Sequence, residues 1–262
     1  MLVKNLTIVI INDRRDQLFE QALLSAAIAE EIIVFDQVSH NNWSTLEKKL
    51  KKINPKLNFR LIFRKNPILD FASLRNKAIA KVHTPWLMFL DSDEILSQQN
   101  LKQLPTLLEN EAVSAYRLKR VDYFHQKKLR FGETGNCSII RLARSNAIRY
   151  QRVVHEIPII AGQVSNSHLE IKHYPHHNLN DFLNTVNNYA ELEASYRFSE
   201  KYFYPKLKII LELLIYPNVK FLVNYLLKLG FADGFAGLAY AVLMSFHSLL
   251  VRVYLYEKYF LN

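Results

Sequence analysis

The chain has 262 residues, half of them apolar, with a formal net charge of +10 and one cysteine, Cys137. A single cysteine excludes an internal disulfide, and no signal-peptide pattern opens the chain, so we expect a cytoplasmic protein. The charge suits nucleic acid, an anionic membrane or a phosphorylated substrate equally well. Because no recognition motif or basic stripe interleaved with aromatics is present, we expect no nucleic-acid partner.

Short apolar runs alternate with segments of helical periodicity along the first two-thirds of the chain. They predict strands at residues 6–11, 32–35, 59–63 and 86–90, and helices at residues 17–29, 44–53, 72–82 and 98–109. Asp70 and Ser73 both suit the N-cap of the third helix. This alternation predicts an α/β fold with a mostly parallel central sheet flanked by helices.

The composition changes near Pro205, where apolar and aromatic residues crowd together. We therefore expect a first domain at residues 1–204 and an amphipathic helical region at residues 205–262. Charges interrupt both apolar stretches of this region, so helices lying in a membrane interface fit better than bilayer spans. The alternative is a helical hairpin packed on the first domain or on a second subunit. The interrupting residues are Lys208, Glu212, Lys220, Lys228, His247 and Arg252.

An apolar run at residues 85–90 ends abruptly in three carboxylates, Asp91, Asp93 and Glu94. Ligands of such sheets bind beyond the carboxyl ends of the strands. Asp91 and Asp93 are two apart, so in an extended strand end they would face one side and could share Mg²⁺ or Mn²⁺. A cation there would bridge phosphate oxygens of a nucleotide sugar and assist loss of the diphosphate. The alternative is a solvated turn or helix N-terminus.

Four segments, at residues 6–11, 31–39, 70–78 and 91–94, resemble family 2 glycosyltransferases of the GT-A fold in sequence, order and spacing. The resemblance is closest to the bacterial branch that includes lipopolysaccharide-core β-1,4-glucosyltransferases. It continues through residues 152–156, 172–174, 188–191 and 230–234. It implies a metal-dependent, inverting enzyme of lipopolysaccharide biosynthesis. From the C-terminal helices we expect this enzyme to be peripheral on the inner face of the cytoplasmic membrane. It would move a hexose, with glucose favoured, from a UDP-sugar to a lipopolysaccharide-core or related glycan or glycolipid acceptor.

The resemblance also implies roles on the donor side of the site. Asp36 would hold the uracil or ribose, since a carboxylate can accept hydrogen bonds from both. Arg75 and Asn76 would lie near the nucleotide or sugar, and Asp91 and Asp93 would be the diphosphate and metal carboxylates. The alternative for Arg75 is an ordinary arginine on a helix surface.

Inverting transfer needs a base for the acceptor hydroxyl, usually a carboxylate. The candidate is Glu156, in the position where similar enzymes carry a His-Glu pair, so Glu156 and Asp93 are the expected catalytic residues. The alternative for Glu156 is a surface ion pair. His173 could supply a third ligand to the cation or touch its phosphate, or it could be a structural histidine. No cysteine partner is present for a zinc module.

Two departures from the family concern donor contacts. The first strand runs into Asn12-Asp13-Arg14-Arg15 in place of a Pro-Thr-x-Asn type loop, and Ser39-His40-Asn41-Asn42 replaces a Ser/Thr-Asp turn. They suggest a catalytically decayed, membrane-associated scaffold as an alternative, against which the intact Asp91, Asp93 and Glu156 argue.

A sugar-phosphate nucleotidyltransferase is a further alternative, although the first loop lacks the glycines that class uses. Motifs of kinases, dehydrogenases and hydrolases are missing.

Overall fold

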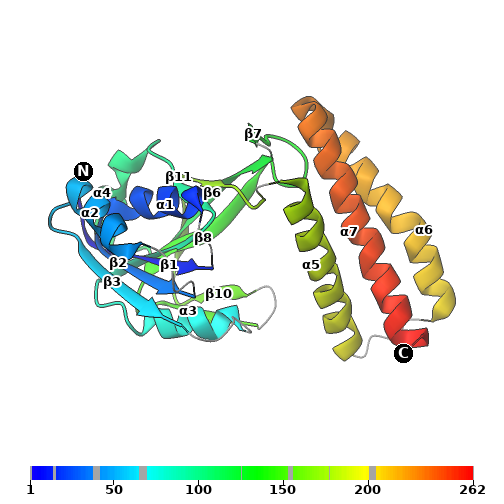
Figure 1. Cartoon of the computed structure of the whole chain (residues 1–262), viewed down its shortest axis with the longest axis horizontal. Helices are drawn as coiled ribbons and strands as arrows, with labels where there is room; N and C mark the ends of the chain where they lie inside the picture. Colours follow the sequence, from blue (N-terminus) through cyan, green and yellow to red (C-terminus); the bar gives the residue numbers. More distant parts are fainter. Residues whose placement is uncertain are drawn as a thin grey trace. The chain divides into compact units, whose positions relative to one another are not determined.

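The computed structural model of the chain describes residues 2–13, 16–37, 42–64, 70–124, 126–152, 156–176, 178–200 and 205–261. The chain forms two compact units. The first comprises Met1–Arg120 and Ser138–His173, and the second comprises Val121–Cys137 and Tyr174–Asn262. The first unit contains the central sheet, and the second contains the three long C-terminal helices (Figure 1).

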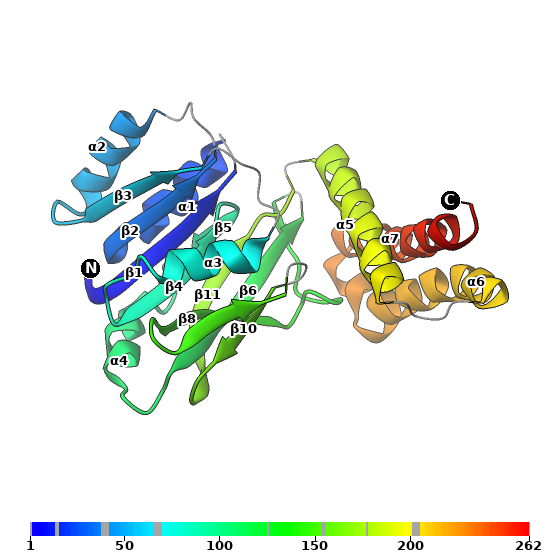
Figure 2. The same ribbon diagram turned by 90° about the horizontal axis from the view of Figure 1, so that it is seen from below.

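One mixed sheet forms the centre of the first unit. Eight of its strands are β1 (Val3–Asn12), β2 (Ala29–Asp36), β3 (Asn58–Phe63), β4 (Trp86–Asp91), β5 (Glu94–Leu96), β6 (Ala115–Phe124), β8 (Cys137–Arg144) and β11 (Val164–His173), and the short β7 (Lys127–Lys128) pairs with the end of β6. They are ordered β3-β2-β1-β4-β8-β6-β11-β5. The strands β3, β2, β1 and β4 are parallel and lie side by side in Figure 2. β8 is antiparallel to β4, and β5 is antiparallel to β11. β9 (Ile148–Gln151) and β10 (Ile157–Ile160) form a separate antiparallel pair.

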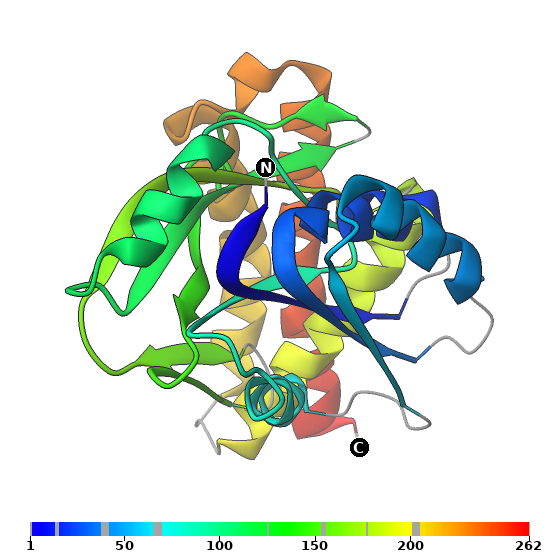
Figure 3. The ribbon, with the colours of Figure 1, turned by 90° about the vertical axis from the view of Figure 1, so that its left-hand side faces the viewer.

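Helices cover both faces of the parallel strands. They are α1 (Gln17–Ser25), α2 (Trp43–Ile53), α3 (Phe71–Ile79) and α4 (Leu104–Glu109). Leu6, Ile8 and Ile10 of β1 pack with α1, α2 and α4, whereas Val9 and Ile11 pack with α3. Figures 1 and 3 show α1 and α3 on opposite sides of the strands. Because both faces are covered, β1, β2 and β4 are buried along most of their length and are mainly apolar on both sides.

The structure confirms the predicted α/β fold with a mostly parallel sheet, and the four predicted strands are β1 to β4. Asp70 is the cap of α3, because its Oδ1 accepts a hydrogen bond from Ser73 N at 2.9 Å. The helix predicted at residues 98–109 is shorter than expected. Asn100 has a left-handed backbone (φ 63°), and only a 3₁₀ turn precedes α4, which begins at Leu104.

Three long helices dominate the second unit. They are α5 (Leu179–Ser199), α6 (Lys206–Leu222), which continues into a π-helical turn at Val223–Leu227, and α7 (Phe235–Phe260). Both α5 and α6 pack against α7. The buried residues of α5 are Phe182, Val186, Ala190 and Ala194. The boundary predicted between residues 204 and 205 therefore lies inside this unit, because α5 buries its apolar side against α7.

A segment from the middle of the chain completes the second unit. Asp233 Oδ2 accepts hydrogen bonds from the main-chain N of Arg130 at 2.8 Å and of Phe131 at 2.9 Å. Asn224 Oδ1 accepts from Glu133 N at 2.7 Å. The turn between α6 and α7 therefore fixes residues 130–133, which precede β8, by hydrogen bonds. This turn includes the 230–234 segment of the predicted resemblance.

Candidate active site

The parallel strands end at one edge of the sheet, and polar side chains follow there as predicted. Asn12 and Asp36 are register partners at the ends of β1 and β2, and Asp91 ends the neighbouring β4. The chain then turns through Asp93 and enters β5 at Glu94. The strand order therefore gathers these carboxylates at the edge where ligands of such sheets bind.

Two arginines bind the Asp91 carboxylate. Arg75 Nη2 of α3 donates to Oδ1 at 2.8 Å, and Arg141 Nη2 of β8 donates to Oδ2. Arg141 also donates to Glu94 Oε1 at 2.7 Å. Partial burial opposes the charge on Asp91, but attraction to Arg141 and Arg75 outweighs it and lowers the pKa of the Asp91 carboxyl. Asp91 is therefore an anion with both oxygens engaged by guanidinium groups.

Arg75 joins this carboxylate to the candidate base. Its Nε donates to Glu156 Oε1 at 3.2 Å. Its guanidinium carbon lies 4.9 Å from the Phe89 ring centroid and 5.3 Å from that of Tyr150. Arg75 is only 3% exposed. It is therefore not an ordinary surface arginine, and its rigid fork holds two carboxylates from distant parts of the sequence together.

Glu156 lies directly before β10, and its side chain is 23% exposed. A base must meet an acceptor hydroxyl, and this partial exposure leaves room for that contact. The three residues before it in the predicted motif, including His155, lie outside the described residues. The structure thus brings Glu156 to the end of β4 through Arg75, which the sequence did not predict.

Asp93 and His173 meet where β5 and β11 pair. His173 is the register partner of Glu94, and its Nε2 lies 3.8 Å from Asp93 Oδ2. A carboxylate oxygen and an imidazole nitrogen are donors that suit Mg²⁺ or Mn²⁺, so these two side chains would be the ones to hold such a cation. Across the described ranges, no group of three His, Cys, Asp or Glu side chains could hold a metal. The predicted set of Asp91, Asp93 and His173 is therefore not assembled, because β4 ends at Asp91 and two arginines hold its carboxylate.

Asp36 and Asn76, both predicted to contact the donor, are engaged by the protein. Asp36 is fully buried and accepts hydrogen bonds from Asn12 Nδ2 at 2.8 Å and Trp43 Nε1 at 3.2 Å. Asn76 Nδ2 donates to the carbonyl O of Tyr150 at 2.8 Å, and its Oδ1 accepts from Tyr150 N at 2.8 Å. Asn76 therefore fastens α3 to β9, and the donor contacts of both residues stay a prediction.

Asn76→Ala should destabilise the first unit by about 2 kcal/mol, because it removes both hydrogen bonds to the Tyr150 main chain. Denaturant unfolding followed by fluorescence measures the change. Asn166→Ala, at an exposed position of β11, is the matched control and should be neutral. Equal stability of the two variants would show that the Asn76 contacts contribute nothing measurable.

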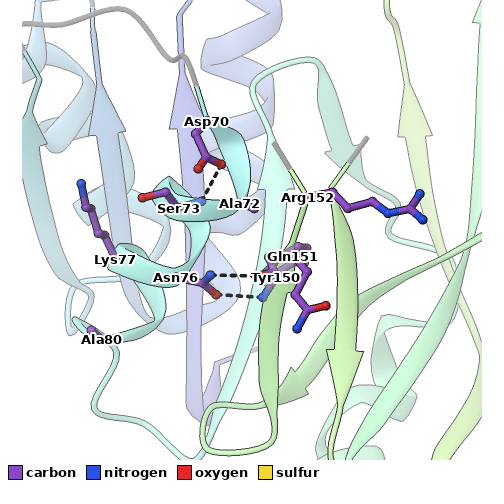
Figure 4. Close-up of a pocket in the computed structure, with 9 residues that line it drawn as sticks. All are labelled: Asp70, Ala72, Ser73, Asn76, Lys77, Ala80, Tyr150, Gln151 and Arg152. Atoms are coloured by element: carbon purple, nitrogen blue, oxygen red, sulfur yellow. Dashed lines mark hydrogen bonds between the residues drawn. The ribbon is translucent and has the colours of Figure 1, made fainter. Parts of the chain in front are cut away.

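A pocket of about 550 Å³ lies beside α3 and β9 (Figure 4). Figure 4 shows Asn76 bridging to Tyr150, and the Arg152 side chain pointing away from α3. Arg152 has a left-handed backbone (φ 72°), which costs a non-glycine residue about 1–3 kcal/mol. None of the predicted catalytic or metal residues lines this pocket, so we do not place the reaction there. The lining residues are Asp70, Ala72, Ser73, Asn76, Lys77, Ala80, Tyr150, Gln151 and Arg152.

Sequence reasoning missed Arg141 and Tyr150. Arg141 interrupts the apolar residues of β8 and is the second partner of Asp91. A charged residue inside an apolar strand seldom lacks a partner, and that signal could have identified it. In the part of the chain that the structure describes, Arg75 Nη1, Arg141 Nε and the Tyr150 hydroxyl are buried without a hydrogen-bond partner. Burial raises the pKa of Tyr150, so its hydroxyl keeps its proton.

The chain has a sheet covered on both faces, with carboxylates and arginines at its strand ends. Its sequence is similar to one protein family. The profile of "Glycosyl transferase family 2" matches residues 5–164. The chain therefore belongs to glycosyl transferase family 2, and its α/β fold is the GT-A fold. This membership speaks against the nucleotidyltransferase alternative.

Among curated proteins none matches this chain. Similar solved structures include Staphylococcus aureus TarS 1-349 in complex with UDP-GlcNAc, at 9% identity and TM-score 0.47, covering 97% of this chain and 91% of that one. A mannosyltransferase, PcManGT from Pyrobaculum calidifontis in complex with GDP-Man and Mn²⁺, has 10% identity and TM-score 0.48, with 95% and 75% covered. Against a longer S. aureus TarS chain the identity is 15% and the TM-score 0.43, and 72% of this chain spans only 39% of that chain.

Proposed function

We propose that the chain transfers a hexose from a UDP-sugar to an acceptor hydroxyl with inversion at the anomeric carbon. The observation that carries the proposal is the Arg75 bridge, which holds the strand-end carboxylate Asp91 and the candidate base Glu156 on one guanidinium group. A base beside the donor end of the sheet is the arrangement that in-line attack on a bound nucleotide sugar needs.

Glu156 would remove the proton of the acceptor hydroxyl. The hydroxyl oxygen forms a bond to the anomeric carbon as the bond from that carbon to the diphosphate oxygen breaks. The proton goes to Glu156, and the electron pair of the broken bond leaves with the UDP. Arg75 fixes one oxygen of Glu156 through its Nε, so the carboxylate is oriented before the acceptor arrives.

Buried donor groups at the site favour an anionic or hydroxylated ligand. Arg75 Nη1, Arg141 Nε and the Tyr150 hydroxyl have no hydrogen-bond partner among the described residues. Buried polar atoms are nearly always paired, so oxygens of the donor's phosphates or sugar are suitable partners. Asp36 and Asn76 would contact the donor in addition to the hydrogen bonds they make within the protein.

Asp93 and His173 would hold the divalent cation, Mg²⁺ or Mn²⁺, that the family resemblance implies. One carboxylate oxygen and one imidazole nitrogen suit such a cation, and the remaining positions would belong to the donor and water. When bound, the cation would neutralise charge on the leaving diphosphate. Asp91 would act beside it by fixing Arg75 and Arg141, because its own oxygens are already engaged.

Asp93→Ala and His173→Ala should each weaken Mn²⁺-dependent binding of UDP-glucose at least about tenfold, because each removes one of two protein ligands. Calorimetric titration with and without Mn²⁺ measures the effect. Asp181→Ala, which removes an acidic residue from the first turn of α5, is the control and should bind as wild type. Unchanged affinity in both site variants would contradict the cation assignment.

The donor sugar and the acceptor are proposed from the resemblance alone. We take UDP-glucose as the donor and a lipopolysaccharide core or related envelope glycan as the acceptor. Titration with UDP-glucose, UDP-galactose and GDP-mannose in Mn²⁺ tests the donor. Tighter binding of UDP-glucose supports the proposal, and tighter binding of GDP-mannose overturns it.

The second candidate is a decayed transferase that serves as a scaffold, which the altered residues after the first two strands favour. UDP with Mn²⁺ should raise the melting temperature of an active transferase, since a ligand that binds only the folded state stabilises it. A scaffold without a donor site would melt at the same temperature with and without UDP.

A further inference from the structure

Both C-terminal helices of the second unit are long and apolar enough to cross a membrane. They are Lys206–Leu227, which includes the π-helical turn, and Phe235–Phe260. Only 17% and 33% of their most apolar stretches are buried within the protein. An apolar helix in the core of a soluble protein would be mostly buried, so packing within this chain does not account for their composition.

The exposed apolar residues of α6 and its π-helical extension form one continuous face. They are separated by four, three, one, seven and four residues, which places them on one broad side of a helix. Each is at least 48% exposed. Isolated exposed leucines are common on soluble proteins, but a contiguous row along a whole helix marks an interaction surface. This α6 stripe comprises Leu207, Leu211, Leu214, Ile215, Leu222 and Leu226.

A second row runs along α7. Val242, Phe246, Val253 and Phe260 are separated by four, seven and seven residues and share one helix face. All four are exposed. The opposite side of α7 contributes Val251 and Leu255 to the buried core of the unit. α7 therefore has two apolar sides. One side packs in the core of the second unit, and the other side is exposed on its surface.

Two of the charges that interrupt these helices in the sequence, Glu212 and Arg252, turn inward. Glu212 and Arg252 have side chains only 14% and 7% exposed, and Arg252 Nε lies 3.5 Å from Glu212 Oε2. Arg252 Nη1 also donates to the carbonyl O of Ser248 at 3.0 Å. Lys220 is paired with Glu133. The Glu212–Arg252 pair therefore keeps two of the interrupting charges away from the exposed apolar face. The exposed lysines that remain can reach lipid headgroups from the ends of the helix.

Exposed cations flank the α6 stripe. Lys206 and Lys208 are exposed at its beginning, and Lys228 is exposed beyond its end. Lysines beside an apolar helix face bind lipid phosphates while the apolar residues enter the acyl region. The net charge of +10 acts in the same direction. Anionic lipid therefore matches this surface in both charge and apolar character.

The packing of the unit favours helices lying in the membrane plane over helices crossing it. α5, which carries Asp181, Glu191 and Glu193, packs along α7. The turn after α6 accepts hydrogen bonds from the main chain of Arg130 and Phe131. A crossing hairpin would carry these polar groups into or through the hydrocarbon. We propose that α6 and α7 dock on an anionic bilayer, with both apolar rows among the acyl chains and the lysines at the headgroups.

Sedimentation of the full-length protein with vesicles tests this proposal. The vesicles contain phosphatidylcholine and phosphatidylglycerol in equal parts, or phosphatidylcholine alone. Wild type should bind the anionic vesicles more tightly. Leu214→Glu combined with Leu222→Glu should bind them at least about tenfold more weakly, because two apolar contacts with the acyl region are lost. Leu183→Glu combined with Leu192→Glu, at exposed positions of α5, is the matched control and should bind as wild type.

A second measurement does not depend on the charged variant folding. Leu214→Cys labelled with a polarity-sensitive dye, in a Cys137→Ser background, should shift its emission to the blue when anionic vesicles are added. No shift, or wild-type binding by the α6 stripe variant, overturns the proposal. A wild-type dimer that the same variant converts to a monomer, with no vesicle binding by either, would assign the stripe to a second copy of the chain instead.

Discussion

Glu156→Gln should lower the rate of sugar transfer about 100- to 10,000-fold while UDP-glucose binding changes little. The amide has nearly the shape of the carboxylate and still accepts a hydrogen bond from Arg75, but it cannot take the hydroxyl proton. The rate is measured as UDP released with a deacylated lipopolysaccharide core as acceptor. Binding is measured by calorimetry in Mn²⁺.

Glu109→Gln is the control for this experiment, because Glu109 is exposed at the end of α4. That variant should transfer sugar at the wild-type rate. Turnover near wild type in Glu156→Gln would remove Glu156 from the mechanism. Loss of donor binding in the same variant would place Glu156 on the donor and away from the acceptor.

Arg75→Ala should abolish most transfer, at least about 100-fold, and lower the free energy of unfolding by about 2 kcal/mol. The substitution leaves Glu156 without its guanidinium partner, leaves Asp91 with Arg141 alone, and opens a space between Phe89 and Tyr150. Breaking a buried ion pair costs about 3–5 kcal/mol. We expect less here because both carboxylates are partly exposed and Asp91 keeps one arginine.

Two further variants separate catalysis from stability. Arg75→Lys keeps the positive charge, but one ammonium group cannot reproduce the planar fork that reaches both carboxylates, so transfer should stay low while stability partly recovers. Arg144→Ala removes another arginine that stacks on an aromatic ring, 4.7 Å from the Trp86 centroid. It should lose stability but keep transfer. Equal transfer by Arg144→Ala and Arg75→Ala would show that Arg75 acts only through folding.

The Arg75 bridge explains how distant parts of the chain can form one site. Asp91 and Glu156 lie 16 and 81 residues after Arg75 in the sequence. Asn76, the next residue of α3, fastens this helix to β9 through Tyr150, and β9 leads toward Glu156. The same short helix therefore positions the arginine and anchors the strand that precedes the base.

The sequence by itself determined the four parallel strands, most of the helices between them and the polar residues at the strand ends. Apolar runs and helical periodicity are local properties, so β1 to β4, α3 with its Asp70 cap and the carboxylates after Trp86–Leu90 could all be predicted. The resemblance to family 2 glycosyltransferases rested on four such local segments, and the family profile confirms it. The beginning of the helix predicted at residues 98–109 was placed too early, because a left-handed Asn100 leaves no periodic signal.

Only the tertiary structure decided which of these residues meet. Arg75 was predicted at the site but not as a bridge to Glu156, and Arg141 was not predicted, because the pairing of β8 with β4 places it at Asp91. The same holds for the second unit, where Glu212 and Arg252 interrupt apolar helices in the sequence but pair inside the bundle. Sequence patterns report the environment of one residue at a time, whereas ion pairs between distant residues depend on how strands and helices pack.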